Sequence, residues 1–392
     1  MQRRIYADNA ATSFPKPPEV WAAMADFGQR VGASAGRGVY REALEAGEVV
    51  DTCRRRIAAL LNAPDPRQIV FGLNCSHALN LVLRGWPNPG DHVVTTRFEH
   101  NSILRPLHDL ARAGVETTFL PVDPADGGVD PAAVRDALRP NTALVALQHA
   151  SNVTGIVQPI VEVARIVGER GIALLIDAAQ TAGHVPIDVQ ALGVDFLAFP
   201  GHKGLLGPLG TGGLYIRPGR EDRLRPLIAG GTGSVSESPQ QPDFLPDKFE
   251  SGSQNAIGLA GLSAGVDWLL RRGVEAVAAH ERSVCEQFVN VLAEVEGLTL
   301  VGPRRAQERV AVFSILVEGY EPAELAAVLE GEFGILCRAG LHCAPWAHEG
   351  LGTRDSGGTL RLSFGPFTTP EDTAACAAAL QEVSTSAARA GR

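Results

Sequence analysis

The chain has 392 residues, of which 45% are hydrophobic, so it can bury a large core and form two or three domains. Its net charge of −9, with no basic stripe, argues against a nucleic-acid-binding protein. The first residues lack the apolar core of a signal peptide, no apolar run matches a membrane span, and six cysteines are too few for a disulfide framework. These features predict a cytoplasmic protein that contacts neither membrane nor nucleic acid.

Residues 16–272 alternate short apolar runs with amphipathic helical stretches. Strands are predicted at 68–72, 92–96, 117–122, 143–149, 173–177, 195–199 and 212–216. Strands that are apolar on both faces and separated by helices form mainly parallel sheets with helices on each side. We therefore predict an α/β fold whose large domain carries a seven-stranded, mainly parallel sheet. In such sheets the ligand site lies beyond the carboxyl ends of the strands.

The remaining stretches predict two further features. Residues 230–253 show neither helical nor strand periodicity, and a long irregular segment of this kind is usually functional, here as an arm toward a second subunit. From residue 273 a long helix (274–295), a strand (310–319), a further helix, the loop 337–350, a strand (359–364) and a final helix follow. This pattern predicts a smaller α+β domain made of residues 1–15 and 273–392.

The stretch "FLAFPGHKGLLGPLGTGGLYI" places a lysine, Lys203, just after a buried strand. The chain contains only three lysines among 35 basic residues, which indicates that lysine is kept where an amine is needed. Asp177 ends the preceding strand, so both side chains are expected at one rim of the sheet. An amine and a carboxylate there suit pyridoxal 5′-phosphate (PLP), because lysine forms an imine with its aldehyde and a carboxylate keeps its ring nitrogen protonated. The alternatives are a helix N-cap for Asp177 and an ordinary surface position for Lys203.

A phosphate site is predicted where "GLNCSHALNLVL" opens a helix, because free backbone amides and the helix dipole favour an anion there. Cys75, Ser76 and His77 stand at this helix start, and His202 can donate a further hydrogen bond. The alternative is plain N-capping by Asn74 or Ser76. A dinucleotide-binding loop follows a strand and opens a helix, whereas the glycines after Lys203 precede a strand. A nucleotide-binding dehydrogenase is therefore disfavoured.

One cysteine differs from the others in its surroundings. Cys53, Cys285, Cys337 and Cys376 fall in helical patterns or at a strand end, as buried cysteines do. Cys343 lies in a loop beside His342 and five residues after Arg338, where positive charge would favour a nucleophilic thiolate. A zinc site made of Cys337, His342, Cys343 and His348 is the alternative, but its spacing matches no familiar pattern. Arg361 lies in a strand, and if it points inward it can grip a substrate carboxylate.

The ordered motifs resemble one family over nearly the whole length. They are "YADNAATSFPKP", "GRGVY", "EHNSILRPL", "HASNVTG", "IDAAQTAGHVPIDV", "GHKGLLGPLGTGGLY", "FESGSQN" and "RAGLHCAP". Together they resemble the cysteine desulfurase / selenocysteine lyase branch of the class V aminotransferases, which have PLP fold-type I. The resemblance implies a PLP-dependent cysteine desulfurase, a homodimer, and no metal.

The resemblance also implies a role for each matching residue. Lys203 looks like the Schiff-base lysine, Asp177 would pair with the pyridine nitrogen, and His100 would stack on the ring and, as a catalytic residue, assist proton transfer. The other cofactor contacts implied are Gln180 and Asn152 near the ring oxygen, and Ser76, His202, the amide of Cys75 and Ser253 of the partner subunit at the phosphate. Arg361, Asn152 and Arg338 would bind the substrate, with Arg338 also positioning the cysteine loop, and Cys343 would be the catalytic sulfur acceptor.

Two positions depart from the family pattern. Pro200 stands where the family commonly has a serine or threonine at the phosphate, and His77 replaces a residue that is normally acidic. Proline offers neither a hydroxyl nor an N–H, so one phosphate anchor is missing.

The expected reaction converts L-cysteine to L-alanine and leaves a persulfide on Cys343, from which a sulfur-acceptor protein takes the sulfur. Alternatives are another PLP-dependent C–S or C–Se lyase, such as a selenocysteine lyase, or an aminotransferase-type enzyme that does not use Cys343. A scaffold that only binds sulfur-carrier proteins is the alternative from a different class.

Overall fold

The largest sheet is built from strands between residues 69 and 216. The computed structural model describes residues 3–36, 38–125 and 127–390. Its seven-stranded sheet has the order β2-β8-β7-β6-β5-β3-β4, and only β8 runs antiparallel to its neighbours. The strands are β2 (Ile69–Gly72), β3 (His92–Thr96), β4 (Glu116–Leu120), β5 (Thr142–Gln148), β6 (Ala173–Asp177), β7 (Phe196–Pro200) and β8 (Gly212–Ile216). The predicted fold class is confirmed, with each strand within a few residues of its expected place.

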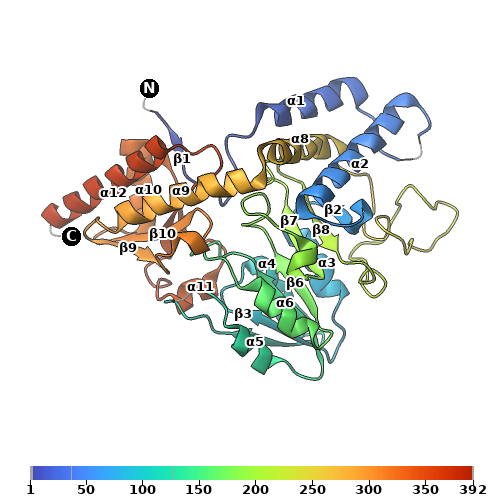
Figure 1. Ribbon diagram of the computed structural model, residues 1–392, viewed down its shortest axis with the longest axis horizontal. Helices are drawn as coiled ribbons and strands as arrows, with labels where there is room; N and C mark the ends of the chain where they lie inside the picture. The colour runs from blue at the N-terminus through green and yellow to red at the C-terminus, as the bar shows by residue number, and fades with distance from the viewer. Residues whose placement is uncertain (1–2, 37, 126, 391–392) are drawn as a thin grey trace.

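Side chains that alternate along each strand build two apolar layers, one on each face of this sheet. On β6, Leu174 and Ile176 face one layer, whereas Ala173 and Leu175 face the other. Both faces are buried because helices cover them (Figure 1). These helices are α2 (Arg41–Leu61), α3 (Cys75–Gly85), α4 (Asn101–Ala111), α5 (Pro131–Ala137), α6 (Ile160–Gly168), α7 (Val189–Leu192) and α8 (Ala256–Arg272), with α1 (Pro18–Asp26) packed on α8.

The chain after residue 273 forms a second sheet and the helices that accompany it. The long helix α9 (Val274–Leu292) runs from the end of α8 into it (Figure 1). A four-stranded antiparallel sheet has the order β12-β13-β10-β9, and Phe288, Phe313 and Phe364 pack edge to face beside it. Its remaining elements are β9 (Leu298–Val301), β10 (Val312–Val317), α10 (Pro322–Phe333), β11 (Ile335–Leu336), β12 (Arg338–Gly340), α11 (Pro345–Gly350), β13 (Thr359–Ser363) and α12 (Pro370–Ala390). The expected loop 337–350 is thus partly ordered as β12 and α11.

The N-terminal strand β1 (Ile5–Tyr6) pairs with β11, and Asp8 bridges to Ser363 of β13. The start of the chain therefore lies against its C-terminal part. The domain boundaries at residues 15 and 273 stay a prediction. Among the described residues, no helix combines the length and the apolar character that crossing a membrane requires.

The segment 230–253 contains no helix or strand among its described residues and extends away from the large sheet (Figure 1). Its C-terminal end is fixed by a buried ion pair, in which the two terminal nitrogens of the Arg54 guanidinium, Nη1 and Nη2, contact Glu250 at 2.7 and 2.9 Å. The backbone N–H of Phe71 donates to the same carboxylate at 2.6 Å. This carboxylate therefore ties α2 and β2 to the segment that carries Ser253.

Replacing Arg54 by methionine is expected to lower the free energy of unfolding by about 3 kcal/mol, because it leaves the Glu250 carboxylate buried without its partner. Urea unfolding at neutral pH measures the change. Arg55→Met is the matched control, since Arg55 pairs with Glu48 on the exposed face of α2 and its removal should change stability by less than about 0.5 kcal/mol. Equal losses in the two variants would contradict this account of the segment.

Candidate active site

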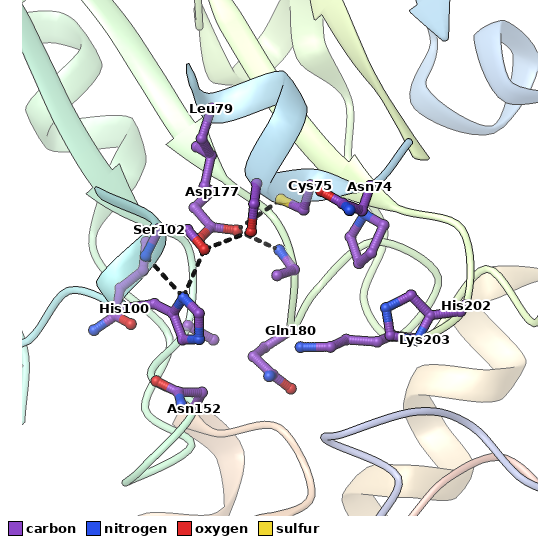
Figure 2. A pocket seen from close by; sticks show the side chains of 15 residues that line it. Asn74, Cys75, Leu79, His100, Ser102, Asn152, Asp177, Gln180, His202 and Lys203 are labelled. Carbon is purple, nitrogen blue, oxygen red and sulfur yellow. Dashed lines mark hydrogen bonds between the residues drawn. The ribbon is translucent and has the colours of Figure 1, made fainter. Parts of the chain in front are cut away.

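A cavity of about 280 Å³ lies beyond the carboxyl ends of β5, β6 and β7. Eight of the predicted site residues line it: Cys75, Ser76, His100, Asn152, Asp177, Gln180, His202 and Lys203. Figure 2 labels all of them except Ser76 and shows the labelled side chains converging from separate elements, with the Lys203 side chain extending into the space between them. Asp177 ends β6 and Lys203 follows β7, so the topology brings amine and carboxylate to one rim as expected.

Asp177 is held rigidly at the floor of this cavity. Its Oδ1 accepts a hydrogen bond from the Ala179 N–H at 2.9 Å and one from the Cys75 thiol at 3.3 Å. The residues that follow form turns rather than a helix, so the alternative of an N-cap is wrong. The carboxylate is only 4% exposed and has room to pair with a buried cation or a protonated ring nitrogen.

Lys203 is positioned by a tight turn. The Leu206 N–H donates to the Lys203 carbonyl at 2.8 Å, and the Gly207 N–H donates to the Gly201 carbonyl at 2.8 Å. Burial lowers the pKa of Lys203, with the nearby Arg361 guanidinium acting in the same direction and Asp177 opposing it. A larger fraction of this amine is therefore neutral than at a surface lysine, and a neutral amine is the nucleophilic form.

The start of α3 forms the end of the cavity where an anion would bind. Asn74 is the N-cap and accepts a hydrogen bond from the His77 N–H at 2.9 Å, which confirms the capping alternative for Asn74. The N–H groups of Cys75 and Ser76, at the start of the helix, stay available to an anion. The Ser76 hydroxyl lies 2.6 Å from that of Ser102. Pro200 lines the same wall without offering a donor, and His77 lines a different groove.

Ser102 is the site residue that sequence reasoning missed. It stands in the first turn of α4, where its N–H donates to Nδ1 of the N-cap His100 at 3.0 Å. A serine two residues after His100 within "EHNSILRPL" was the available signal. Burial is the main cause that lowers the pKa of His100 to about 4, so the ring is uncharged at neutral pH and can lie flat against an aromatic ligand.

Two buried polar atoms of the cavity residues, Asn152 Oδ1 and His202 Nδ1, have no hydrogen-bond partner among the described residues. Burial lowers the pKa of His202 to about 4, so its ring is neutral and offers one N–H. Buried polar groups are normally satisfied, and these two point to a polar ligand. An amine, a fixed carboxylate, a helix start and unsatisfied polar atoms around one cavity fit the groups of PLP.

Cys343 lies at the outer side of this cavity. A cleft of about 640 Å³ shares Ser76, His100 and Ser102 with the cavity and has exposed Cys343 on its wall. Arg338 Nη2 is 3.9 Å from the Cys343 sulfur. The cleft that carries Cys343 therefore adjoins the inner cavity.

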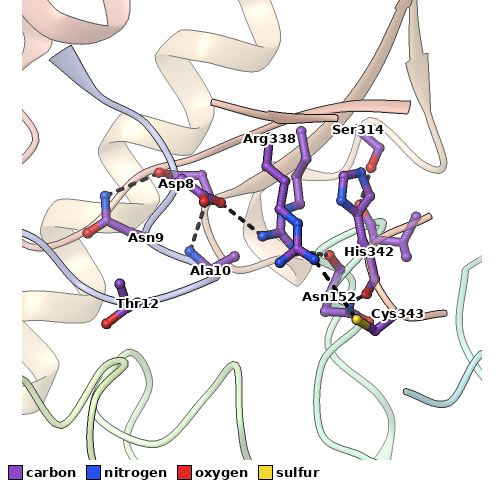
Figure 3. A network of polar contacts seen from close by, with 12 residues as sticks. Asp8, Asn9, Ala10, Thr12, Asn152, Ser314, Arg338, His342 and Cys343 are labelled. Atoms are coloured by element: carbon purple, nitrogen blue, oxygen red, sulfur yellow. Dashed lines mark hydrogen bonds and ion pairs between the residues drawn. The ribbon is translucent and has the colours of Figure 1, made fainter. Parts of the chain in front are cut away.

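The cysteine loop is pinned in an unusual backbone conformation. His342 and Cys343 have φ values of +49° and +59°, in the left-handed region that non-glycine residues rarely adopt. The Asn152 Nδ2 donates to the His342 carbonyl at 2.6 Å, and the Asn101 N–H donates to the Cys343 carbonyl at 2.8 Å. Figure 3 shows His342, Cys343 and Asn152 side by side at this point.

His342 does not supply the positive charge that was expected beside the thiol, and that expectation is wrong. Its ring is buried, its Nε2 lies 3.1 Å from the Thr359 carbonyl, and burial lowers its pKa to about 2. His348 is likewise engaged in a hydrogen bond, since its Nδ1 lies 2.7 Å from the Thr353 hydroxyl oxygen. Within residues 3–36, 38–125 and 127–390, no group of histidine, cysteine or acidic side chains is arranged to hold a metal ion, which leaves the zinc alternative without support.

Arg361 points inward and is 2% exposed. Its Nη2 pairs with Asp8 Oδ1 at 3.0 Å, its Nη1 donates to the Asn152 carbonyl at 3.2 Å, and its Nε has no partner among the described residues. Arg338 stands directly opposite it in the β12–β13 register. Two guanidinium groups therefore lie between the cysteine loop and the N-terminal segment.

Ser253 is the predicted residue that the structure places elsewhere. It is exposed and lines a separate groove with Phe71, His77 and Ile228. Its assignment to the partner subunit's phosphate site stays a prediction.

Three buried histidines give an expected pH dependence of stability. Burial lowers the pKa of His149 and His348 from 6.5 to about 4, and that of His342 to about 2. The unfolded chain then binds more protons below about pH 6.5, so stability falls as pH falls, by on the order of 1 kcal/mol per pH unit for each group. Glu99, whose pKa burial raises to about 8, acts in the opposite direction.

Urea unfolding at several pH values between about 7 and 5 measures this slope. We expect His149→Gln to flatten it and the exposed His108→Gln to leave it unchanged. A slope that is equal in wild type and His149→Gln would contradict the assignment of a neutral, buried His149 ring.

Comparison with known proteins agrees with this geometry. Residues 5–375 match the profile of the family "Aminotransferase class-V". A probable cysteine desulfurase of Methanothermobacter thermautotrophicus is 35% identical, covering 98% of this chain and 95% of the relative, and one of Streptomyces coelicolor is 36% identical, covering 97% and 92%.

Solved structures give the same result. The apo structure of a cysteine desulfurase from Thermococcus onnurineus has a TM-score of 0.92 and 33% identity, covering 98% of this chain and 95% of that one. The cysteine desulfurase CsdA from Escherichia coli has a TM-score of 0.85 and 30% identity, covering 97% and 94%. The chain is therefore a member of the class V aminotransferase family.

Proposed function

We propose that this protein is a PLP-dependent cysteine desulfurase, a sulfurtransferase that converts L-cysteine to L-alanine and takes the sulfur onto Cys343. The observation that carries the proposal is that Lys203 and Asp177 line one cavity while Cys343 lines the adjoining cleft. The cavity and the cleft share Ser76, His100 and Ser102. Relatives named cysteine desulfurase, at about one third identity over nearly the whole chain, support it.

The cofactor implied by the family would be held by groups that this chain presents. Lys203 would bind its aldehyde carbon, Asp177 its ring nitrogen and His100 one ring face, with Asn152 and Gln180 near the ring oxygen. Ser76, His202 and the Cys75 amide would hold the phosphate. PLP supplies an aldehyde that condenses with amines and a ring that stabilises negative charge on the adjacent carbon.

The residues of this chain would perform the remaining steps. Arg361 binds the substrate carboxylate, and the Lys203 amine, with its lowered pKa, takes the α-proton and later returns a proton to the product. The Cys343 thiolate attacks the substrate sulfur, so an S–S bond forms as the C–S bond breaks. The bonding electrons return to the carbon skeleton, which is protonated to alanine, and the net change is L-cysteine plus a thiol giving L-alanine plus a persulfide.

The experiment that tests this proposal is an assay of alanine and persulfide from L-cysteine with purified, PLP-loaded protein. We expect one persulfide per Cys343 and one alanine per persulfide before any acceptor is added. Alanine formation without protein-bound sulfur would favour a direct lyase. A cytoplasmic location, a homodimer in which Ser253 reaches the partner subunit, and a protein sulfur acceptor belong to the same proposal.

A further inference from the structure

The backbone carbonyl of His202, beside the cavity, accepts hydrogen bonds from several donors in a distant part of the chain. The His202 carbonyl oxygen receives the Thr12 hydroxyl at 3.0 Å, the Ser13 N–H at 3.1 Å and the Ser13 hydroxyl at 3.2 Å. The Lys16 ammonium lies 3.1 Å from the same oxygen. A carbonyl oxygen has two lone pairs. Here four donors share one carbonyl oxygen and hold it from several directions.

This carbonyl belongs to the peptide that joins His202 to Lys203. The orientation of this peptide sets the direction in which the Lys203 side chain leaves the backbone. On the other side of Lys203, its own carbonyl accepts from the Leu206 N–H at 2.8 Å. The backbone is thus fixed immediately before and after the residue whose amine enters the cavity.

Lys16 is one of only three lysines, in a chain that uses arginine for its other 32 fixed cations (35 − 3). Its Nζ also donates to the Ser13 hydroxyl at 2.9 Å, and burial lowers its pKa to about 8, so most of it stays charged at neutral pH. A compact ammonium with three donors can serve a hydroxyl and a carbonyl at once, whereas the wider planar guanidinium suits carboxylates.

The same stretch of chain holds further site residues. Asp8 pairs with Arg361 at 3.0 Å, and the Ala10 carbonyl accepts from Gln180 Nε2 at 3.2 Å. Figure 3 shows Asp8, Asn9, Ala10 and Thr12 following one another along this segment. Residues 8–16, which we call the N-terminal strap, therefore contact the expected carboxylate-binding arginine, a cofactor-binding glutamine and the peptide of the lysine.

We propose that the N-terminal strap positions the active site, and that Thr12 and Lys16 are positioning residues for the Lys203 amine. The inference rests on the proposed function, because it needs Lys203 to be the residue that binds the cofactor. Without these donors only the N–H and hydroxyl of Ser13 hold the His202 carbonyl, so the His202–Lys203 peptide is held less rigidly and the amine spends less time in its reactive position. Misplacing a reacting group by about 1 Å can cost up to about 100-fold in rate.

The test compares Thr12→Val, Thr12→Ser and Lys16→Met with wild type. Apo-protein is mixed with PLP, and the rate at which the absorbance of bound cofactor appears is measured, followed by kcat and KM for L-cysteine. For Thr12→Val and Lys16→Met we expect both the cofactor-binding rate and kcat to fall about 10-fold, with KM within about 2-fold of wild type. Thr12→Ser keeps the hydroxyl and should stay close to wild type.

Lys248→Met is the matched control for loss of a lysine whose amine contacts backbone carbonyls. The Lys248 amine donates to the carbonyls of Glu221 and Asp222 at 2.6 and 3.4 Å, outside the residues that line the cavity. It should lower thermal stability as Lys16→Met does, without the change in cofactor-binding rate.

Wild-type rates of cofactor binding and turnover in both Thr12→Val and Lys16→Met would overturn the inference, as would equal rate losses in Lys248→Met. A wild-type protein that binds PLP and forms alanine, with unaffected strap variants, leaves the proposed function intact. A wild type that does neither overturns the proposed function, and the inference falls with it.

Discussion

Lys203→Ala is expected to form no alanine from L-cysteine above about 10⁻³ of the wild-type rate, because the variant lacks the amine that we propose both anchors the cofactor and removes the α-proton. The variant should also lose the absorbance of lysine-bound cofactor, while its far-ultraviolet circular dichroism stays unchanged. Absorbance spectra and initial rates measure the two effects.

Lys203→Arg is the informative control for this variant. It keeps a positive charge beside Asp177 but cannot form an imine, since the guanidinium stays protonated. Activity in Lys203→Arg above about a tenth of wild type would show that the site needs a charge rather than an amine, and the account of Lys203 would then be wrong.

Cys343→Ser is expected to bind cofactor normally and to release sulfide from L-cysteine at least about 100-fold more slowly than wild type, because a hydroxyl cannot accept sulfur as a persulfide. The cavity itself should be unaffected, since Cys343 stands on the outer cleft and lines no part of the inner cavity. Sulfide release under a reducing thiol measures the effect.

Cys337→Ser serves as the matched control. Cys337 is partly buried six residues earlier, between β11 and β12, and burial raises its pKa to about 12, so it is no thiolate at neutral pH. We expect Cys337→Ser to keep at least about half of the wild-type rate. Near-normal sulfide release by Cys343→Ser would remove the persulfide step and favour a lyase that does not use this cysteine.

The layered fold and the Asp177–Lys203 rim were predictable because they follow from local patterns. Runs that are apolar on both faces identify buried parallel strands, and the rim then follows from the order of strands and helices. Each of the strands β5 to β8 occurs within two residues of its expected range. Burial of whole strands leaves a strong signal in the sequence.

Polar side chains that meet across the fold leave no comparable signal. Asp8 and Arg361 are 353 positions apart, and nothing in either neighbourhood indicates that they pair. His342 illustrates the same limit, because the sequence places it beside Cys343 while the fold turns its ring toward Thr359. Ser102 was overlooked because a serine in a first helical turn is common and its contact with Ser76 depends on the packing of α3 on α4.

The loop 337–350 was misjudged for a related reason. Its Gly340, Pro345 and Gly350 are typical of an irregular segment. In the fold, β12 pairs with β13 over Arg338–Gly340, and α11 starts at Pro345. Tertiary pairing therefore orders a stretch that is too short and too mixed to show periodicity of its own.

The account depends most on the covalent attachment of PLP to the lysine beside Asp177. With lysines only at positions 16, 203 and 248, borohydride reduction of the PLP-loaded protein followed by peptide mass mapping tests it directly. We predict that the reduced cofactor is found on the peptide containing Lys203 and on no other. Cofactor on the Lys16 or Lys248 peptide, or on none, would contradict the central claim.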